Sequence, residues 1–154
     1  MVIQIDTREH EKAVKKIKQH FISNNILFFD SKLFVGDYMS LDNARFCIDR
    51  KKDLFELCQN VCQDHKRFVS ELKRANKFGI KLVFLIEHSP DIRTIDDVKA
   101  WENPRLKTSK LAVSGERLYK VLRALEQTFD TKFYFCSKEQ TARGIIKLLK
   151  MNGG

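Results

Sequence analysis

The segment IKLVFLIE at residues 80–87 establishes which class of fold the sequence predicts. Its side chains are almost continuously apolar from Leu82 to Ile86, which is typical of a strand that is covered on both faces by other elements. The run ends on a carboxylate, Glu87. We therefore place this strand in the middle of a sheet that has a helical layer on each side.

Shorter strand-like and helix-like segments alternate on either side of this run. Short apolar or β-branched runs predict further strands at residues 2–6, 26–29, 33–38, 45–50 and 133–135. Apolar spacings of three and four predict helices at residues 9–24, 53–77, 95–101, from 114 onward and 138–150, the second of them kinked or split in two. The alternation predicts an α/β fold in which the strands between residues 26 and 50 form a meander.

Two local patterns refine the second half of the chain. Ser137 and Gln140 stand three residues apart before an apolar run, which is typical of a capping box, so we expect the last helix to begin at Lys138. The polar and basic residues 103–110 predict a loop.

Length and charge limit the class of protein. Of the 154 residues, 43% are hydrophobic, which is enough for one buried core, so we expect a single domain over residues 1–154. Lys and Arg outnumber Asp and Glu by 29 to 20, and the net charge of +9 favours a polyanionic partner such as nucleic acid. The alternative is a positive charge that only maintains solubility, so motifs must decide between the two.

The sequence has no segment typical of a membrane or exported protein. Its apolar runs are far shorter than the roughly 20 residues that span a bilayer. Near the amino terminus, charged side chains stand where a signal peptide needs an apolar core: Asp6, Arg8 and Glu9. We therefore expect an intracellular protein without membrane contact, cytoplasmic if the host is a bacterium or a phage.

The four cysteines, Cys47, Cys58, Cys62 and Cys136, have apolar or helical neighbours, so we interpret them as free thiols rather than a disulfide framework. Cys58, Cys62 and His65 share one helical face, which makes a structural zinc site a second interpretation. A fourth zinc ligand is not evident in the sequence.

Three aspartates stand beside strand-like segments: Asp6, Asp37 and Asp49. Strand ends are where α/β folds place their sites. Lys51 follows Asp49 by two residues, and on a strand such side chains project to the same side. Carboxylates bind hard divalent cations, which acidify water and neutralise phosphoryl charge, and a nearby lysine stabilises the transition state. The pattern predicts a site for phosphodiester hydrolysis.

The motifs DTRE at residues 6–9, GDY at 36–38 and IDRK at 48–51 resemble, in order, those of the XPF-type structure-specific nuclease domain of the PD-(D/E)xK superfamily. That family has an Asp-x-Arg-Glu, then Gly-Asp, a spacer, Glu-Arg-Lys, three residues and a further Asp. The resemblance covers most of the chain. It implies a restriction-endonuclease-like mixed central sheet flanked by helices, in a stand-alone form without helix-hairpin-helix modules.

Two positions depart from the family pattern. Asp49 replaces the Glu of Glu-Arg-Lys, and the wider superfamily also uses this shorter carboxylate. Phe55 stands where the last Asp is expected, with Asp53 and Glu56 on either side. Either acid is a candidate replacement, although Asp53 also suits the start of a helix as a cap.

The resemblance implies roles for the acids and for the lysine. Asp37 and Asp49 would bind Mg²⁺, for which Mn²⁺ substitutes, and the carbonyl after Asp49 would add a ligand. Lys51 would assist the attacking water. Asp6 would support a metal-bound water or a second ion, or alternatively would form a turn that caps the first helix.

Several basic residues are candidates for DNA contact. Arg8 and Arg50 suit either phosphate binding or ion pairs with the aspartates. Arg67 matches the family's Gly-Arg element and would contact the DNA backbone, with a solvated helix face as the alternative. His65 is a candidate general acid or a structural histidine. Glu87 would support the metal or simply end its strand.

The preferred function is therefore metal-dependent endonucleolytic cleavage of DNA, at branched, flap or junction structures as the resemblance implies. Family members usually dimerise, so we expect a homodimer or a heterodimer through the nuclease domain. The alternative is a catalytically silent subunit that binds DNA and dimerises within a nuclease complex. An RNA substrate stays open, and the basic loop residues Arg105, Lys107 and Lys110 suit either a phosphate backbone or ordinary surface charge.

Overall fold

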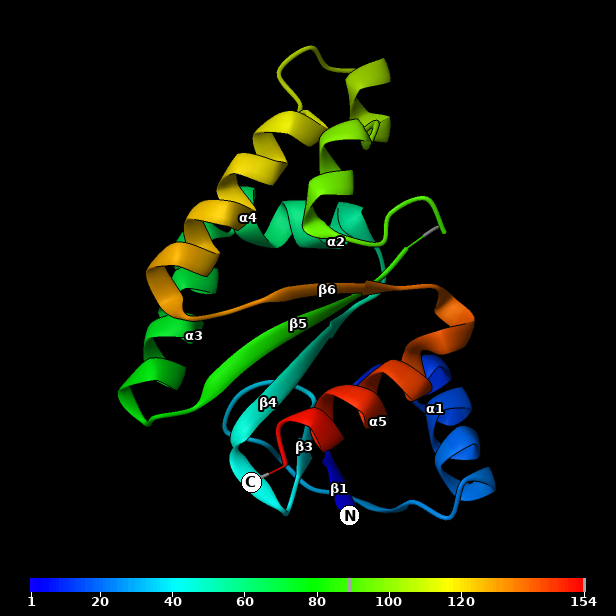
Figure 1. The fold of residues 1–154 in the computed structure, drawn as a ribbon. Coiled ribbons are helices and arrows are strands. Elements are labelled where there is room, and N and C mark those ends of the chain that lie inside the picture. Colours follow the sequence, from blue (N-terminus) through cyan, green and yellow to red (C-terminus); the bar gives the residue numbers. More distant parts are fainter. Residues whose placement is uncertain (89, 154) are drawn as a thin grey trace.

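The computed structural model describes residues 1–88 and 90–153 and contains one mixed six-stranded sheet (Figure 1). The strand order is β2-β1-β3-β4-β5-β6. β1 pairs with β2 in parallel and with β3 antiparallel, β3 and β4 are antiparallel, and β4, β5 and β6 are parallel. The strands are β1 (Val2–Ile5), β2 (Leu27–Asp30), β3 (Tyr38–Ser40), β4 (Asn43–Lys51), β5 (Lys81–Glu87) and β6 (Phe133–Cys136).

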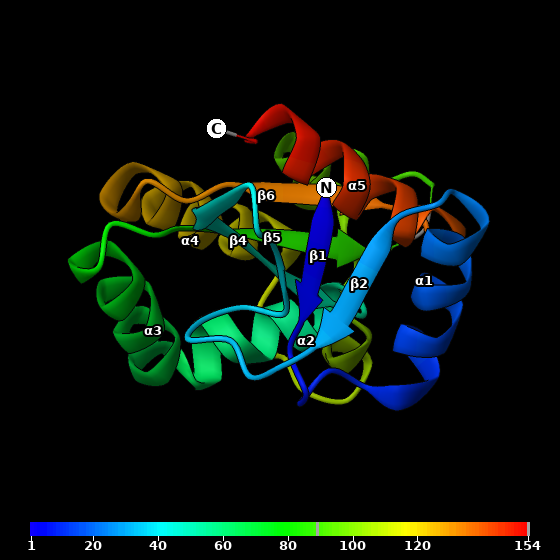
Figure 2. The same cartoon turned by 90° about the horizontal axis from the view of Figure 1, so that it is seen from below.

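Helices cover both faces of the sheet, which confirms the predicted α/β architecture. One face carries α2, α3 and α4, and the other carries α1 and α5, as Figures 1 and 2 show from two directions. The α-helices are α1 (Glu11–Ser23), α2 (Leu54–Cys58), α3 (His65–Lys77), α4 (Gly115–Phe129) and α5 (Thr141–Met151). The short 3-10 helices are η2 (Ile95–Ala100), η3 (Pro104–Lys107) and η4 (Lys138–Gln140).

β5 is buried on both faces, as its apolar run predicts. Leu82 and Phe84 pack into the apolar cluster under α2, α3 and α4, whereas Val83 and Leu85 pack into the cluster under α1 and α5. The strand is internal to the sheet, paired with β4 and β6 along its length. Only β6 lies outside it, so β3 and β4 are nearer to the centre than β5.

The predicted meander is wrong in its first half. β2 lies at the outer edge of the sheet, parallel to β1, and does not contact β3 in the ladder. Residues 33–37 form a loop rather than a strand, although Leu33 and Val35 are buried. The strand begins only at Tyr38, because Gly36 takes a φ of 73° and turns the chain into the sheet. Of the strands within residues 26–51, β3 and β4 form the antiparallel hairpin.

The two helices predicted between residues 53 and 77 are confirmed, and a π-helical segment, η1 (Gln59–Gln63), separates α2 from α3. The predicted capping box is wrong. The Ser137 side chain makes no capping hydrogen bond, and residues Lys138–Gln140 form a 3-10 turn before α5 begins at Thr141. The segment expected as a loop at 103–110 contains η3, which Asn103 caps by accepting a hydrogen bond from Arg105 N at 3.0 Å.

All four cysteines are free thiols. Within residues 1–88 and 90–153, no helix has the length and apolar character to cross a membrane.

Candidate active site

Asp37 is held between two strands by its own backbone. Its N–H donates to the carbonyl of Ile48 in β4 at 2.8 Å, and its carbonyl accepts from Asp6 N, just after β1, at 2.8 Å. The preceding Gly36 lies so close to β4 that a Cβ there would sit 3.1 Å from Ile48 O and 3.3 Å from Cys47 Cβ. The Gly-Asp pair therefore serves to bring a carboxylate against β4, where a larger residue than glycine does not fit.

Asp49 and Lys51 project from the same face of β4, as their spacing predicts. Lys51 Nζ lies 3.1 Å from Asp49 Oδ1, and both side chains are largely buried. Apart from this contact with the lysine, the buried Asp49 Oδ1 accepts no hydrogen bond from the residues that the structure describes. A buried carboxylate oxygen is thus left without a hydrogen bond beside the lysine.

The acidic pair is destabilised in its charged form. Burial, and then the neighbouring Asp49 and Glu9, raise the pKa of Asp37 well above its usual range. Burial also raises the pKa of Asp49 to about 6, against the opposing effect of Lys51. Burial alone would lower the pKa of Lys51, but Asp49, Glu56 and Asp37 together outweigh it, so that pKa is raised and the ammonium stays protonated.

This donor set fits a hard divalent cation. The Asp49 carboxyl lies close enough to Asp37 to raise its pKa, and the buried Asp49 Oδ1 has only the Lys51 ammonium beside it. A cation would relieve both the repulsion and the unmet oxygen. Within the described residues, no three His, Cys, Asp or Glu side chains are grouped to hold a metal ion. The ligand set of Asp37, Asp49 and the carbonyl after Asp49 stays a prediction.

Arg50 projects to the opposite face of β4 and enters a buried ion-pair network. Its Nε and Nη2 donate to the two oxygens of Glu9 at 2.7 and 3.0 Å, and its Nη1 donates to Glu87 Oε1 at 3.0 Å. Tyr38 Oη donates to Glu9 at 2.8 Å, and Thr141 Oγ1 donates to Glu87 at 2.9 Å. The Arg50 side chain is only 5% exposed, which favours the structural ion pair over a phosphate contact.

Asp6 makes a turn at the end of β1. Its Oδ1 accepts from Leu33 N at 2.8 Å, and its Oδ2 accepts from Arg8 N and Nε at 3.1 and 2.9 Å. Burial opposes ionisation, but these hydrogen bonds together lower the pKa of Asp6. The carboxylate thus fixes the loop before Asp37 and orients Arg8, whose side chain remains 62% exposed. A direct part for Asp6 in chemistry stays a prediction.

The two acids beside Phe55 have different places. Asp53 caps α2, since its Oδ1 accepts from Glu56 N at 2.7 Å, in agreement with the capping role considered above. Glu56 points into the cleft beside Lys51 and contributes to the raised pKa of that lysine. Of the two candidates for the missing Asp, Glu56 is the one that faces the site.

A cleft of about 290 Å³ opens beside Lys51, between β4 and the helical segment that follows it. Its lining includes the predicted Arg67 and also Asn60 and Glu71, which the motifs did not identify. Glu71 lies close enough to Asp49 to raise the pKa of that carboxyl. The lining residues are Lys51, Glu56, Asn60, Asp64, Arg67, Phe68 and Glu71.

His65 does not line this cleft. Its Nδ1 lies 2.8 Å from the carbonyl of Val61, one turn earlier in the helix. This contact favours the structural reading of His65 over the general acid. The signal for Glu71 was present in the sequence, because it stands one helical turn after Arg67 and so shares its face.

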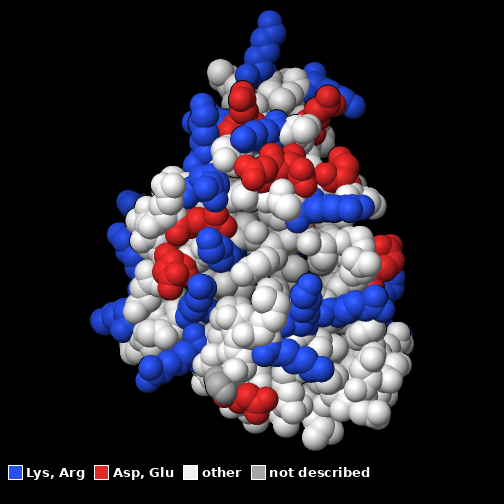
Figure 3. Space-filling view, in the orientation of Figure 1, with Lys and Arg blue, Asp and Glu red and all other residues white. Residues whose placement is uncertain are grey.

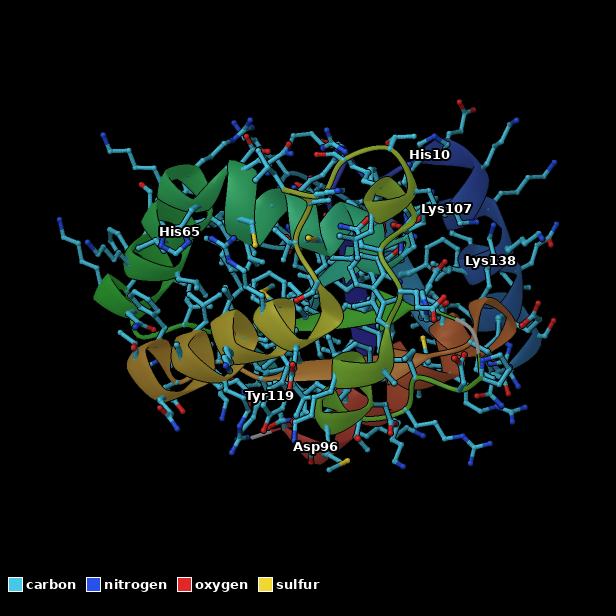
Figure 4. The ribbon with its side chains drawn as sticks, turned by 90° about the horizontal axis from the view of Figure 1, so that it is seen from above. His10, His65, Asp96, Lys107, Tyr119 and Lys138 are labelled. Atoms are coloured by element: carbon cyan, nitrogen blue, oxygen red, sulfur yellow. The ribbon has the colours of Figure 1, made fainter. Side chains whose placement is uncertain are left out.

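A second and larger cleft, of about 530 Å³, lies on the side of α1 and α5. Exposed cations line much of it, and Figure 4 shows two of its lining residues, His10 and Lys138, on the same side of the molecule, with His65 on the other. Glu56 lines both clefts, so the two openings flank the site. The cations of this second cleft with exposed side chains are Arg8, Lys12, Lys16, Lys52 and Lys138.

Comparison with known proteins finds a family and a fold. The model of the ERCC4 domain matches residues 5–149. XPF from Aeropyrum pernix has a similar structure, with a TM-score of 0.69 and 18% identity over 99% of this chain and 65% of that chain. The structure of XPF from Aeropyrum pernix in complex with DNA is also similar, with a TM-score of 0.67 and 16% identity. That match covers 98% of this chain and 64% of that chain. No curated protein matches the chain.

At these identities the solved structures establish a common fold, and this chain spans about two thirds of their length. The family match is more specific, because it covers nearly the whole chain. The matched range includes Asp6, Asp37, Asp49 and Lys51. The chain therefore belongs to the ERCC4 domain family.

Proposed function

We propose that this protein is a metal-dependent endonuclease that hydrolyses phosphodiester bonds in DNA. The observation that carries the proposal is the ion pair between Lys51, which lines an open cleft, and the buried Asp49, whose Oδ1 accepts no other hydrogen bond. The Asp37 carboxyl lies close enough to interact electrostatically with both. A purely structural role would leave that Asp49 oxygen satisfied. The membership of the ERCC4 domain family supports the same reaction class.

In this proposal, the residues of the site have separate roles. Asp37 and Asp49, with the Arg50 carbonyl, would hold Mg²⁺ or Mn²⁺. When bound, the ion would neutralise phosphoryl charge and make water more acidic. Lys51, kept protonated by Asp49, donates hydrogen bonds to a phosphoryl oxygen or to the attacking water. Asp6 acts through Arg8, whose guanidinium it orients near Asp37.

The basic surface on both sides of the site would bind the sugar-phosphate backbone. Arg67 lines the first cleft, and Arg8 lines the second. The net charge of +9 adds a general attraction for polyanions, which release counterions on binding. In Figure 3, Lys and Arg side chains run along the edge of the molecule over α3 and α4, which extends this surface.

Branched, flap or junction DNA is the substrate that we propose, acted on by a homodimer or heterodimer formed through the nuclease domain. The solved complex of XPF from Aeropyrum pernix with DNA concerns that protein, but its shared fold supports DNA as the partner here. Single strands and RNA belong in the same assay as competing substrates.

The test is cleavage of end-labelled single-stranded, duplex, flap and four-way-junction substrates in Mg²⁺, Mn²⁺ or EDTA. Asp49→Asn and Lys51→Met are expected to lose cleavage by at least a hundredfold, the scale of one positioned catalytic group, while still binding DNA. Asp96→Asn and Lys147→Met, two exposed positions outside both clefts, are the matched controls. Circular dichroism would show that the variants fold.

One observation favours the alternative, a silent DNA-binding subunit: Phe55 replaces the last family Asp. In that case the wild type binds these substrates in every metal and cuts none. The Glu56→Gln variant separates the two, because under the nuclease proposal it lowers the cleavage rate, whereas a silent subunit has no rate to lose.

A further inference from the structure

Two phenylalanines lie exposed on the surface at the far end of α3. Phe34 and Phe78 are 46% and 58% exposed, and their rings meet edge to face with centroids 4.9 Å apart. Phe34 belongs to the loop before Asp37, and Phe78 follows the last residue of α3. Most phenylalanines of the chain are buried at least in part, so two that meet at the surface form a local feature.

Cations hold this aromatic pair in place. The Arg74 guanidinium lies 4.3 Å from the Phe34 ring centroid and donates a hydrogen bond to the Phe34 carbonyl. Lys77 Nζ lies 5.9 Å from the Phe78 ring centroid. The guanidinium is thus held over an aromatic ring, and the pair presents π surface and positive charge together.

The aromatic pair continues the face of α3 that lines the catalytic cleft. Arg67 and Glu71 line the cleft, and Arg74 and Phe78 follow at helical spacings of three and four, which place all four side chains along one side. Phe34 reaches the Phe78 ring from the loop before β3, and it stands only three residues before Asp37. A chain that leaves the cleft along α3 therefore reaches this pair next.

We propose that Phe34, Arg74 and Phe78 form a stacking platform for an unpaired nucleotide of the DNA strand that leaves the site. The proposal rests on the proposed function and specifies the substrate as DNA with a single-stranded segment beside the cut. Bases have π faces that stack on aromatic rings and guanidinium planes, and their phosphates pair with Arg74 and Lys77. A purely apolar partner would leave these cations unpaired, which argues for a nucleic acid rather than for a protein surface.

The test measures DNA binding by fluorescence anisotropy in EDTA, where binding does not depend on cleavage. The probes are a flap substrate and a blunt duplex of equal length, each with wild type, Phe78→Leu and Phe78→Trp. Stacking of one base is worth about 1–3 kcal/mol by substitution, so Phe78→Leu is expected to weaken flap binding about tenfold. Duplex binding stays unchanged, and Phe78→Trp retains flap binding. Leu111→Ala, at another exposed apolar position, is the control.

Three results would overturn the platform. Equal weakening of flap and duplex would mean general charge or folding effects. Unchanged flap binding in Phe78→Leu would mean that no base stacks there. A change of oligomeric state in Phe78→Leu on size-exclusion chromatography would identify the pair as a protein interface. The proposed nuclease function fails separately, if wild type binds the flap with Phe78-dependent affinity yet never cuts it in Mg²⁺ or Mn²⁺.

Discussion

The two faces of β4 treat charge in opposite ways. On one face, Arg50 is enclosed by Glu9 and Glu87, and every polar end of its guanidinium has a partner. On the other face, Asp49 has one lysine and an oxygen without a hydrogen bond. Adjacent residues of one strand therefore carry a completed ion-pair network beside the larger cleft and an incomplete one beside the smaller cleft that Lys51 lines.

The difference shows how stability and function divide within one short motif. A buried arginine between two carboxylates joins β4 to the first loop and to the end of β5, so it belongs to the scaffold. Asp49 and Lys51, on the other face, form an ion pair in which the charged form of Asp49 is still disfavoured by burial. A bound metal ion would stabilise that charge, and a phosphate would pair with the lysine. Four predictions test this division, beginning with the largest effect.

Removing the cation from the completed network is expected to cost the most stability. Arg50→Met leaves Glu9 and Glu87 buried without their partner, and breaking such a pair typically costs on the order of 3–5 kcal/mol. Urea unfolding at pH 7 measures the loss. Restoring neutrality with Glu9→Gln and Glu87→Gln in the same chain should recover part of it. A loss below about 1 kcal/mol would contradict the scaffold role, since that is the scale of a surface ion pair.

On the face of β4 that carries Asp49, the free energy of unfolding is expected to fall as pH rises. The pKa of Asp49 is raised to about 6 from 3.8, so the folded state holds this proton more tightly than the unfolded state. Its contribution to stability is therefore full below pH 3.8 and lost as pH rises through about 6. With 1.36 kcal/mol for each pH unit, the loss is on the order of 3 kcal/mol.

The measurement is the difference in unfolding free energy between Asp49→Asn and wild type from pH 4 to pH 7, without divalent ions. Asn carries no charge, so the variant should gain on wild type as pH rises, and Mg²⁺ should narrow the gap by stabilising only wild type. A difference that is independent of pH would show that Asp49 is not strained in its charged form.

Substitution of Gly36, which lies close against β4, is expected to cause the next largest loss of stability. Gly36 and Gly79 both have positive φ, but nothing lies within 4 Å of a Cβ at Gly79, whereas three atoms lie within 3.3 Å at Gly36. Gly79→Ala therefore measures backbone strain alone, about 1–2 kcal/mol. Gly36→Ala adds overpacking of about 1–3 kcal/mol and should also slow cleavage by displacing Asp37. Equal thermal unfolding of the two variants would refute the close-approach argument.

The smallest expected change in stability distinguishes the roles of Asp53 and Glu56, the two acids that flank Phe55. Asp53→Ala removes a helix cap and should cost about 1 kcal/mol of stability. Glu56→Gln should leave stability nearly unchanged and alter the cleavage rate, because this side chain lines the cleft. Parallel unfolding and cleavage measurements on both variants check the pair. If Asp53→Ala slows cleavage more than Glu56→Gln, the assignment of the missing acid is reversed.

Local pattern in the sequence predicted much of this arrangement. The apolar run of β5 and the order of the three motifs gave the fold class, and the spacing of Asp49 and Lys51 placed them on one face. That same alternation also implied that Arg50 faces the other way. The sequence left Arg50 open because its partners, Glu9 and Glu87, lie 41 and 37 residues away.

The errors arise where tertiary packing outweighs local preference. Leu33 and Val35 are apolar like a strand, but they are buried in a loop because Asp6 and Gly36 fix the chain there. β2 pairs in parallel with β1 through the connection that α1 provides, and no short-range signal reveals this register.

The open outer side of β2 has a consequence for how copies of the molecule behave toward one another. An edge strand whose Leu27 and Phe29 are exposed offers unpaired backbone groups and apolar side chains for intermolecular strand addition. The net charge of +9 keeps molecules apart at low ionic strength. Salt shortens the reach of that repulsion to about 10 Å at 0.1 M. Colloidal stability should therefore decline as salt is added, and the same salt will weaken attraction to DNA.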